Sequence, residues 1–209
     1  MNNYVITIAR GFGSGGKQIG LKLAGELGIK LMDKELLQLA SIESGISEEL
    51  FALADEKLNR RLLMMVPDRE HYGNVLTPEN NKFVSDVNLF NYQVKILKML
   101  AKTESFIVMG KAANYVLRDL DNVVSVNIQA PFENCVKTIM ERSDMTEKEA
   151  ANAVRRTDKY RSEYHKYYTG ENWKDSVNYD LCLNSASIGW DNCAEVIKQC
   201  VRSKLGISL

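Results

Sequence analysis

A glycine-rich segment near the N-terminus is the part of the sequence best suited to bind phosphate. Residues 11–18 read Gly-Phe-Gly-Ser-Gly-Gly-Lys-Gln and follow an apolar, β-branched run over residues 4–9. A glycine-rich turn between a strand and a helix lets consecutive backbone N–H groups surround a phosphate, and the helix N-terminus adds a favourable dipole. We expect Lys17 to reach the β- and γ-phosphates of a nucleotide. The predicted nucleotide-binding residues are Gly11, Gly13, Ser14, Gly15, Gly16, Lys17 and Gln18.

The position after this lysine departs from the usual P-loop pattern, G-x-x-x-x-G-K-[ST]. Gln18 stands where a hydroxyl side chain ordinarily contacts Mg²⁺. A glutamine carbonyl can ligate magnesium directly or through water, although its longer side chain is less well suited, and Ser14 offers another oxygen nearby. We therefore expect Mg²⁺ as the cofactor with ATP, with Gln18 or Ser14 as the protein groups able to contribute.

The same glycines also fit the G-x-G-x-x-G pattern of dinucleotide-binding folds. Gly11, Gly13 and Gly16 match that pattern, and Asp33 ends a predicted second strand about where a ribose-binding acid would stand. Two features favour the P-loop interpretation: Lys17 directly follows the last glycine, and the chain also has the cationic helix described next, which hydride transfer does not require. A dinucleotide-dependent oxidoreductase remains the less favoured alternative.

A second cationic cluster lies on a helix predicted to begin at the capping box Thr146-Glu-Lys-Glu149. Arg155, Asp158 and Arg161 are spaced three apart, so we expect them to lie near one another. Phosphoryl transfer needs positive charge around the transferred group, and arginine forks supply it well. A charged helix of this kind can equally be a solvated face held by ion pairs. Beside the glycine loop, we interpret the helix as catalytic, and the candidates are Lys17, Arg155, Arg156 and Arg161.

The elements that must position these groups alternate between strand and helix. Strands are predicted at residues 4–9, 29–33, 105–110, 122–129 and 179–184, and helices begin near residues 16, 47, 131, 146 and 190. Between the second and third strands lies a long, mostly helical excursion with a loop near residues 66–81. This alternation predicts an α/β fold with a parallel sheet covered by helices on both faces. We expect one domain over residues 1–209.

Composition narrows the classes of partner. The chain has 27 basic and 27 acidic residues, so no global field attracts nucleic acid or an anionic membrane. No stretch approaches the roughly 20 apolar residues that span a bilayer, and no signal-peptide pattern is present. The four cysteines lack the close pairs of a zinc site. We expect a cytoplasmic protein whose partners are nucleotides, with no nucleic acid or membrane partner; its oligomeric state stays open.

Several segments together resemble the cytidylate kinase-like family of P-loop kinases, which are related to the CMP kinases. The similarity covers nearly the whole chain and is carried by Ile6-Thr-Ile-Ala-Arg-Gly-Phe-Gly-Ser-Gly-Gly-Lys17, Leu27-Gly-Ile-Lys-Leu-Met-Asp-Lys-Glu-Leu-Leu37, Gly110-Lys-Ala-Ala-Asn-Tyr115, Arg156-Thr-Asp-Lys-Tyr-Arg161 and Tyr179-Asp-Leu-Cys-Leu-Asn-Ser185. The resemblance implies five parallel strands, a helical acceptor-binding insertion at residues 34–104 and an arginine-rich lid at residues 144–170. It also implies acceptor-binding roles for Asp33, Lys111, Asp158 and Arg161.

The predicted function is therefore an ATP-dependent phosphotransferase that moves the γ-phosphoryl group to a nucleoside monophosphate, with CMP or dCMP as the first candidate. A nucleotide sensor without turnover is the alternative from the binding class. Gln18 and Lys111 would favour that alternative, because Lys111 stands where the family usually has an arginine and offers only a point charge.

Overall fold

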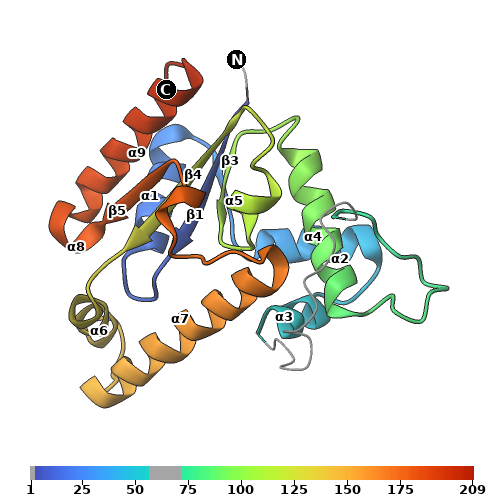
Figure 1. Cartoon of the computed structure of the whole chain (residues 1–209), viewed down its shortest axis with the longest axis horizontal. Coiled ribbons are helices and arrows are strands. Elements are labelled where there is room, and N and C mark those ends of the chain that lie inside the picture. Colours follow the sequence, from blue (N-terminus) through green and yellow to red (C-terminus); the bar gives the residue numbers. More distant parts are fainter. Residues whose placement is uncertain (1–2, 57–71) are drawn as a thin grey trace.

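Five parallel strands form one sheet in the order β2-β3-β1-β4-β5 (Figure 1). The computed structural model describes residues 3–56 and 72–209. The strands are β1 (Val5–Arg10), β2 (Lys30–Met32), β3 (Phe106–Met109), β4 (Val123–Gln129) and β5 (Leu181–Asn184). In the register of the sheet, Val5 of the central strand pairs with Phe106 on one side and Val123 on the other. The prediction of a parallel α/β sheet is confirmed.

The strand order decides between the two glycine-loop folds considered for the sequence. In the Rossmann dinucleotide-binding order, 3-2-1-4-5-6, the second strand lies beside the first. Here β3 lies between β2 and β1, since β2 pairs with β3 and β3 pairs with β1. The alternative of a Rossmann-type dinucleotide fold is therefore wrong for this chain.

Helices cover both faces of the sheet. Ile6 and Ile8 of β1 face the helices α1 (Gly16–Leu27) and α9 (Trp190–Leu205). Val5 faces the opposite side, where α4 (Asp86–Leu100), α5 (Ala113–Val116) and the last part of α7 (Glu147–Thr169) pack. Because neither face meets water, the central strands are apolar almost throughout, as expected for a buried parallel sheet.

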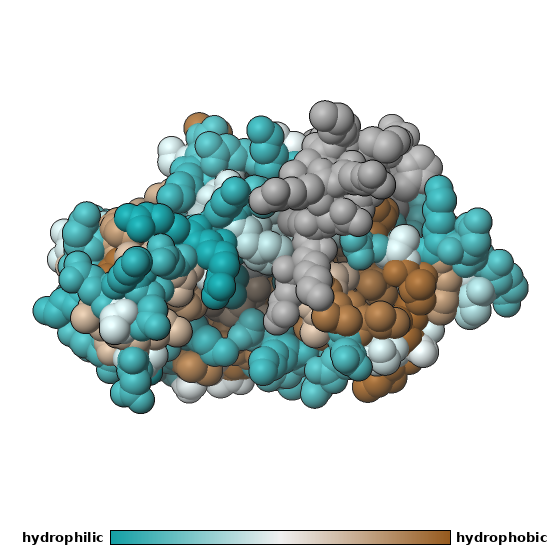
Figure 2. Space-filling view, turned by 90° about the horizontal axis from the view of Figure 1, so that it is seen from below, coloured by the Kyte–Doolittle hydropathy of each residue, from teal (hydrophilic) through white to brown (hydrophobic). Residues whose placement is uncertain are grey.

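The helical excursion between β2 and β3 contains α2 (Glu35–Ser44), α3 (Glu48–Glu56) and α4. Its helices share a separate apolar cluster that includes Leu37, Phe51 and Leu89. Figure 2 shows apolar side chains gathered on the side of the molecule that carries these helices. Residues 57–71 lie outside the described residues, so the loop predicted at 66–81 is described only in part. The acceptor-binding role of the insertion at 34–104 remains a prediction.

The helix α7 runs along the carboxyl edge of the sheet (Figure 1). Its predicted capping box is confirmed, because the Thr146 hydroxyl accepts from the Glu149 N–H and the Glu149 carboxylate accepts from the Thr146 N–H. Tyr168, near the other end, stacks on Phe90 of α4 with 3.9 Å between ring centroids. The C-terminal half of α7 thus belongs to the main core, while its N-terminal half packs on α6 (Phe132–Met140).

Within residues 3–56 and 72–209, three short elements had no counterpart in the sequence-based prediction: α5, the 3₁₀ turn Ser176–Asn178 and α8 (Ser185–Ile188). Each is only three or four residues long, too short for hydrophobic periodicity to show. None of the helices in the described ranges is both long and apolar enough to cross a bilayer.

Candidate active site

The glycine loop forms the turn from β1 into α1, and two of its glycines are required by geometry. Gly13 and Gly15 have φ values of 86° and 77°, in the left-handed region. A Cβ atom at Gly13 would lie 2.5 Å from the Cys135 carbonyl oxygen, and one at Gly15 would lie 2.2 Å from the Trp190 ring. The N–H groups in the first turn of α1 have no partner within the helix. The loop therefore has the backbone geometry of an anion site, and nucleotide binding there remains a prediction.

Ser14 and Gln18, the two candidate metal ligands, lie in different surroundings. Ser14 is buried, its hydroxyl donates to the Gly11 carbonyl at 2.9 Å, and its own carbonyl accepts from the Ser185 hydroxyl at 2.6 Å. These two hydrogen bonds of Ser14 thus stabilise the conformation of the loop. Gln18 is partly exposed on the first turn of α1, which suits a ligand that acts directly or through water. Among the described residues, no group of three or more His, Cys, Asp or Glu side chains could hold a metal by itself.

Lys17 and Asp33 form an ion pair with 2.8 Å between Nζ and Oδ2. Burial alone would raise the pKa of Asp33, but the hydrogen bond and charge of Lys17, with Arg10 and Lys111 nearby, bring that pKa below its ordinary value. The Lys17 side chain is 54% exposed, so it remains accessible to a ligand. The structure thus brings together a predicted donor-binding residue and a predicted acceptor-binding residue.

Next to this pair lies a cavity of about 510 Å³, within the range of small-molecule sites of roughly 300–1,000 Å³. Its walls come from β1, α2, α3, α5, α7 and the turn after β3. The lining residues are Ala9, Arg10, Asp33, Lys34, Leu37, Glu48, Ala52, Met109, Gly110, Lys111, Ala112, Asn114, Thr157, Tyr160, Arg161, Tyr164, His165 and Trp173. Of the predicted acceptor-binding residues, Asp33, Lys111 and Arg161 line this cavity and Asp158 does not.

Two arginines line the cavity without a carboxylate partner. Within residues 3–56 and 72–209, neither the Arg10 nor the Arg161 guanidinium forms a salt bridge with an acid. Arg161 donates to the Arg10 carbonyl at 3.0 Å, and a Cβ atom at Gly110 would lie 2.4 Å from Arg10 Nη1. Burial lowers the pKa of both groups, that of Arg161 to about 9.

Arg10 is a functional candidate that the sequence-based prediction missed. It ends a strand whose other residues are apolar or small, and it stands directly before the glycine loop. A charged side chain at the end of a buried strand was the available signal, because charged residues are almost never buried unless they are paired.

Lys111 enters the cavity from a strained turn. Gly110, Lys111 and Ala112 all have positive φ values, of 72°, 58° and 52°. Left-handed backbone at non-glycine residues is costly and clusters at functional sites. Burial and the Arg10 charge lower the pKa of Lys111 to about 7, against the opposing effect of Asp33. Lys111 is thus a cation that titrates near neutral pH.

The predicted arginine pair of α7 does not form in the cavity. Arg155 and Arg156 are exposed, and the Arg155 guanidinium lies over the Phe132 ring, 4.5 Å from its centroid. Three residues turn an α-helix by about 300°, so six residues leave Arg155 and Arg161 about 120° apart around the helix axis. Of the two guanidinium groups in the cavity, one comes from α7 and the other from β1. The catalytic role assigned to Arg155 or Arg156 remains a prediction.

Asp158 contacts the glycine loop instead of the cavity. Its Oδ1 accepts from the Phe12 N–H at 2.7 Å. Burial raises the pKa of Asp158, although the Phe12 N–H and the Arg161 charge oppose this effect. This hydrogen bond ties α7 to the loop, and Asp158 is not among the residues that line the cavity.

Comparison with known sequences assigns the chain to a family. The profile of the cytidylate kinase-like family matches residues 5–187. The chain belongs to the cytidylate kinase-like family. The assignment agrees with the five-stranded parallel sheet and supports a nucleotide kinase as the type of enzyme. No curated protein sequence matches the chain significantly.

Solved structures show how widely this cytidylate kinase-like fold is shared. An uncharacterized protein from Eubacterium ventriosum ATCC 27560 is 27% identical, with a TM-score of 0.70 over 96% of this chain and 99% of that one. TT1252 from Thermus thermophilus is 20% identical, with a TM-score of 0.51 over 98% and 99%. A shikimate kinase from Bacteroides thetaiotaomicron is 10% identical, with a TM-score of 0.51 over 98% and 99%. The last two likenesses concern the fold alone.

Proposed function

We propose that this protein transfers the γ-phosphoryl group of ATP to an acceptor that already carries a phosphate, of the nucleoside monophosphate class. The observation that carries the proposal is the pair of guanidinium groups, from Arg10 and Arg161, that line one cavity beside the glycine loop. Both side chains are partly buried, which makes an unpaired charge costly, and the described part of the chain supplies no carboxylate within salt-bridge distance for either group. A phosphate dianion offers the oxygens that two arginine forks bind best.

The donor nucleotide occupies the glycine loop in this proposal. The N–H groups at the start of α1 surround its phosphates, and Lys17 exchanges the Asp33 carboxylate for the β- and γ-phosphate oxygens. Magnesium would neutralise phosphate charge when bound, and Gln18, partly exposed on the first turn of α1, is the candidate to contact it or one of its waters. Asp33, once released by Lys17, would remain near Arg10 and Lys111 on the lining of the cavity.

The transfer itself needs positioning and positive charge more than a base. An ionised oxygen of the acceptor phosphate attacks the γ-phosphorus while the bond to the β–γ bridging oxygen breaks. The products are ADP and a diphosphorylated acceptor. Arg161 and Arg10, with Lys111 in its protonated form, stabilise the negative charge that spreads over the transferred group.

A turnover assay with a panel of acceptors tests the proposal. ADP formation from MgATP is measured with CMP, dCMP, UMP, AMP and GMP, and with no acceptor as the control for hydrolysis. We expect one or more monophosphates to raise ADP formation above the control, and the family makes CMP and dCMP the first candidates. ADP formation that no monophosphate raises would contradict the proposed reaction.

A nucleotide sensor is the second candidate function. Two departures favour it: Gln18 replaces the hydroxyl that usually contacts magnesium, and Lys111 is a cation whose pKa near 7 leaves it only partly charged at neutral pH. ATP binding at micromolar concentrations without ADP formation in the same assay would support the sensor over the kinase.

A further inference from the structure

The cavity also contains buried polar side chains that carry no charge, and two of them have no hydrogen-bond partner among the described residues. Asn114, Tyr164 and His165 line it and are 6%, 8% and 5% exposed. Within the described residues, the Tyr164 hydroxyl and His165 Nε2 make no hydrogen bond. Asn114 adds a carboxamide to the lining of the same cavity. Buried polar groups are hydrogen-bonded in the great majority of structures, so two unpartnered groups on one cavity call for a ligand.

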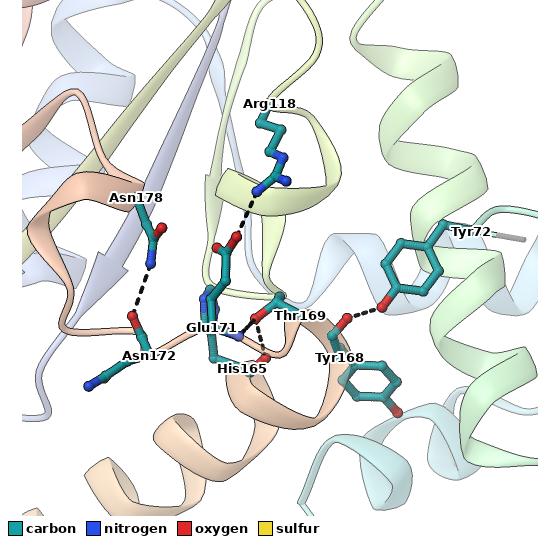
Figure 3. A network of polar contacts seen from close by, with 8 residues as sticks. All are labelled: Tyr72, Arg118, His165, Tyr168, Thr169, Glu171, Asn172 and Asn178. Atoms are coloured by element: carbon teal, nitrogen blue, oxygen red, sulfur yellow. Dashed lines mark hydrogen bonds and ion pairs between the residues drawn. The ribbon is translucent and has the colours of Figure 1, made fainter. Parts of the chain in front are cut away.

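The hydrogen bonds near His165 do not use its imidazole ring. Thr169 donates to the His165 backbone carbonyl at 2.7 Å, and the Glu171 N–H donates to the Thr169 hydroxyl (Figure 3). Arg118 pairs with Glu171 at 2.7 Å in the same network. The network therefore fixes the end of α7 through its backbone and does not use Nε2 of His165, a residue that lines the cavity.

These three residues lie beyond the cationic groups on both walls of the cavity. On α7, His165 follows Arg161 by four residues, which is about one helical turn or 6 Å along the axis. On the opposite wall, Asn114 follows Lys111 by three residues, on the short helix α5. The cavity thus has a cationic end beside the glycine loop and a second end one turn farther along α7.

The lining residues of the second end carry no formal charge. The Glu171 carboxylate, which pairs with Arg118, acts on His165 from outside the lining and opposes the effect of burial on its pKa. Burial lowers the pKa of His165 to about 4, so its imidazole is neutral at physiological pH and offers one N–H donor and one acceptor nitrogen. The Asn114 carboxamide offers both kinds of group, and the buried Trp173 supplies an aromatic wall. The remaining charged lining residues, Lys34 and Glu48, are exposed. A second phosphate or a carboxylate would find no cation here, whereas a neutral ring with donors and acceptors on its edge fits the available groups.

We infer that Asn114, Tyr164 and His165 form a subsite for the nucleobase of the acceptor, whose phosphate lies at the cationic end of the same cavity. The inference rests on the proposed function and assigns base discrimination to residues of α5 and α7. Hydrogen bonding gives strong discrimination here, because a wrong base leaves buried polar groups unpaired.

The test compares probes that fill one end of the cavity or both. Ribose 5-phosphate occupies the cationic end alone, whereas CMP, UMP, AMP and GMP reach both ends. Binding to the full chain is measured by calorimetry in the presence of a non-hydrolysable ATP analogue. For the wild-type protein, we expect at least one nucleotide to bind about tenfold more tightly than ribose 5-phosphate.

Two independent variants each remove one hydrogen-bonding side chain from the second end of the cavity. Asn114→Leu and His165→Phe should each lower the affinity for the preferred nucleotide by about tenfold, and should leave that for ribose 5-phosphate within about twofold. Gln93→Leu is the matched control, because Gln93 is also buried with an unpartnered Oε1 but lies on α4 outside the cavity lining. Circular dichroism and thermal unfolding establish that each variant folds. His165→Phe should not lose stability without ligand, since it removes an unpaired polar group.

The outcomes separate this inference from the proposed function. If the wild-type protein binds neither ribose 5-phosphate nor any nucleotide at the acceptor site, the proposed function fails and the inference fails with it. If ribose 5-phosphate binds as tightly as every nucleotide, the cavity takes a phosphorylated ligand but the base subsite is overturned. Equal nucleotide preference in wild type and both folded variants would likewise overturn the assignment to Asn114 and His165.

Discussion

The ion pair between Lys17 and Asp33 illustrates how single residues serve two states of this protein. In the ligand-free protein, the carboxylate compensates the lysine at 2.8 Å, and the lysine side chain is still 54% exposed. Ion pairs this accessible to solvent contribute only about 0–1 kcal/mol to folding. If phosphate oxygens replace the Asp33 carboxylate, the folded protein should therefore lose little stability, and the Lys17 charge is available to the ligand.

Lys17→Ala should abolish function without unfolding the protein. We expect ATP turnover to fall by at least about a hundredfold, because the phosphates lose a charge placed at the site of transfer. The free energy of unfolding should change by less than about 1 kcal/mol. Lys22→Ala is the matched control, since Lys22 lies on the same helix and pairs with Glu26 and Asp191 away from the loop. A folded Lys17→Ala protein with wild-type turnover would contradict the P-loop assignment.

Gln18 should matter less than Lys17 for magnesium-dependent turnover. Mg²⁺ retains several waters and is held largely by phosphate oxygens, so one side-chain contact is a small part of its coordination. We expect Gln18→Ala to lower turnover by less than about tenfold and Gln18→Thr to leave magnesium affinity unchanged or tighter. Turnover measured against magnesium concentration tests both. A loss in Gln18→Ala as large as that in Lys17→Ala would show that Gln18 is an essential ligand.

Lys111 should make acceptor binding depend on pH. Burial and Arg10 lower its pKa to about 7, so the ligand-free protein loses this charge as the pH rises through 7. An anionic acceptor binds the protonated form, and its affinity should therefore fall by about tenfold from pH 7 to 8.5. In Lys111→Arg, which stays charged, the affinity should be nearly flat over that range. Titration of ribose 5-phosphate at each pH measures the effect, and identical profiles for both proteins would exclude Lys111 as the titrating group.

The lowered pKa of Lys111 also makes the free energy of unfolding depend on pH. The pKa of Lys111 in the folded protein lies below its ordinary value of 10.5, so between these two values the unfolded chain binds the extra proton. The contribution of this group to the free energy of unfolding therefore rises from about pH 7 towards pH 10.5 and is lost again as the pH falls.

The two halves of α7 pack differently: the second half belongs to the main core, and the first half packs mainly on α6. Tyr164, Tyr167 and Tyr168 belong to the main core, whereas Ala150 and Val154 share a small separate cluster with α6. The link from the middle of the helix to the glycine loop is the hydrogen bond from the Phe12 N–H to Asp158. A helix arranged in this way can admit substrate by local movement of its first half while the second half keeps its place.

Hydrogen exchange should be faster in the first half of α7 than in the second half. In the ligand-free protein, we expect the amides of residues 150–158 to exchange faster than those of residues 162–169, because fewer buried contacts hold the first half. Addition of a non-hydrolysable ATP analogue with CMP should slow exchange in residues 150–158 only. Mass spectrometry of overlapping peptides measures both. Equal protection of the two halves would indicate a rigid helix that does not act as a lid.

For the whole molecule, balanced charge means that nucleotide selectivity arises in the site itself. The chain has 27 basic and 27 acidic residues, yet Arg10, Lys111 and Arg161 converge on one cavity. Long-range attraction of anions is thus weak, and recognition depends on contacts within the site. Ligands that fit both the loop and the cavity should accordingly stabilise the entire fold.

Thermal unfolding should distinguish ATP from dinucleotides. A ligand at one hundred times its Kd stabilises a protein by about 2.7 kcal/mol, equivalent to a rise in Tm of about 5–10 °C for a chain of this size. We expect such a rise with MgATP and a further rise when CMP is added. NAD should produce none, because the strand order is not that of the Rossmann dinucleotide fold. A shift with NAD and none with MgATP would contradict the nucleotide proposed here.

The sequence by itself determined the features that depend on neighbouring residues. The β-branched run of β1, the glycine conformations of the loop and the capping box of α7 each act over a few positions, and each was predicted from local patterns. The insertion between β2 and β3 and the alternation of strands with helices also followed from composition along the chain. Short-range sterics and hydrogen bonding suffice for these features.

Only the tertiary structure decided which side chains meet in the cavity. Arg161 contacts the carbonyl of Arg10, 151 positions away, and Asp158 contacts the Phe12 N–H, 146 positions away. The rotation of α7 turns Arg155 onto α6 and brings Arg161 and His165 to the cavity, while the turn after β3 carries Lys111 and Asn114 to the opposite wall. These contacts depend on strand order and on how helices pack against the sheet. A local sequence pattern does not predict them, because they join segments that are far apart in the sequence.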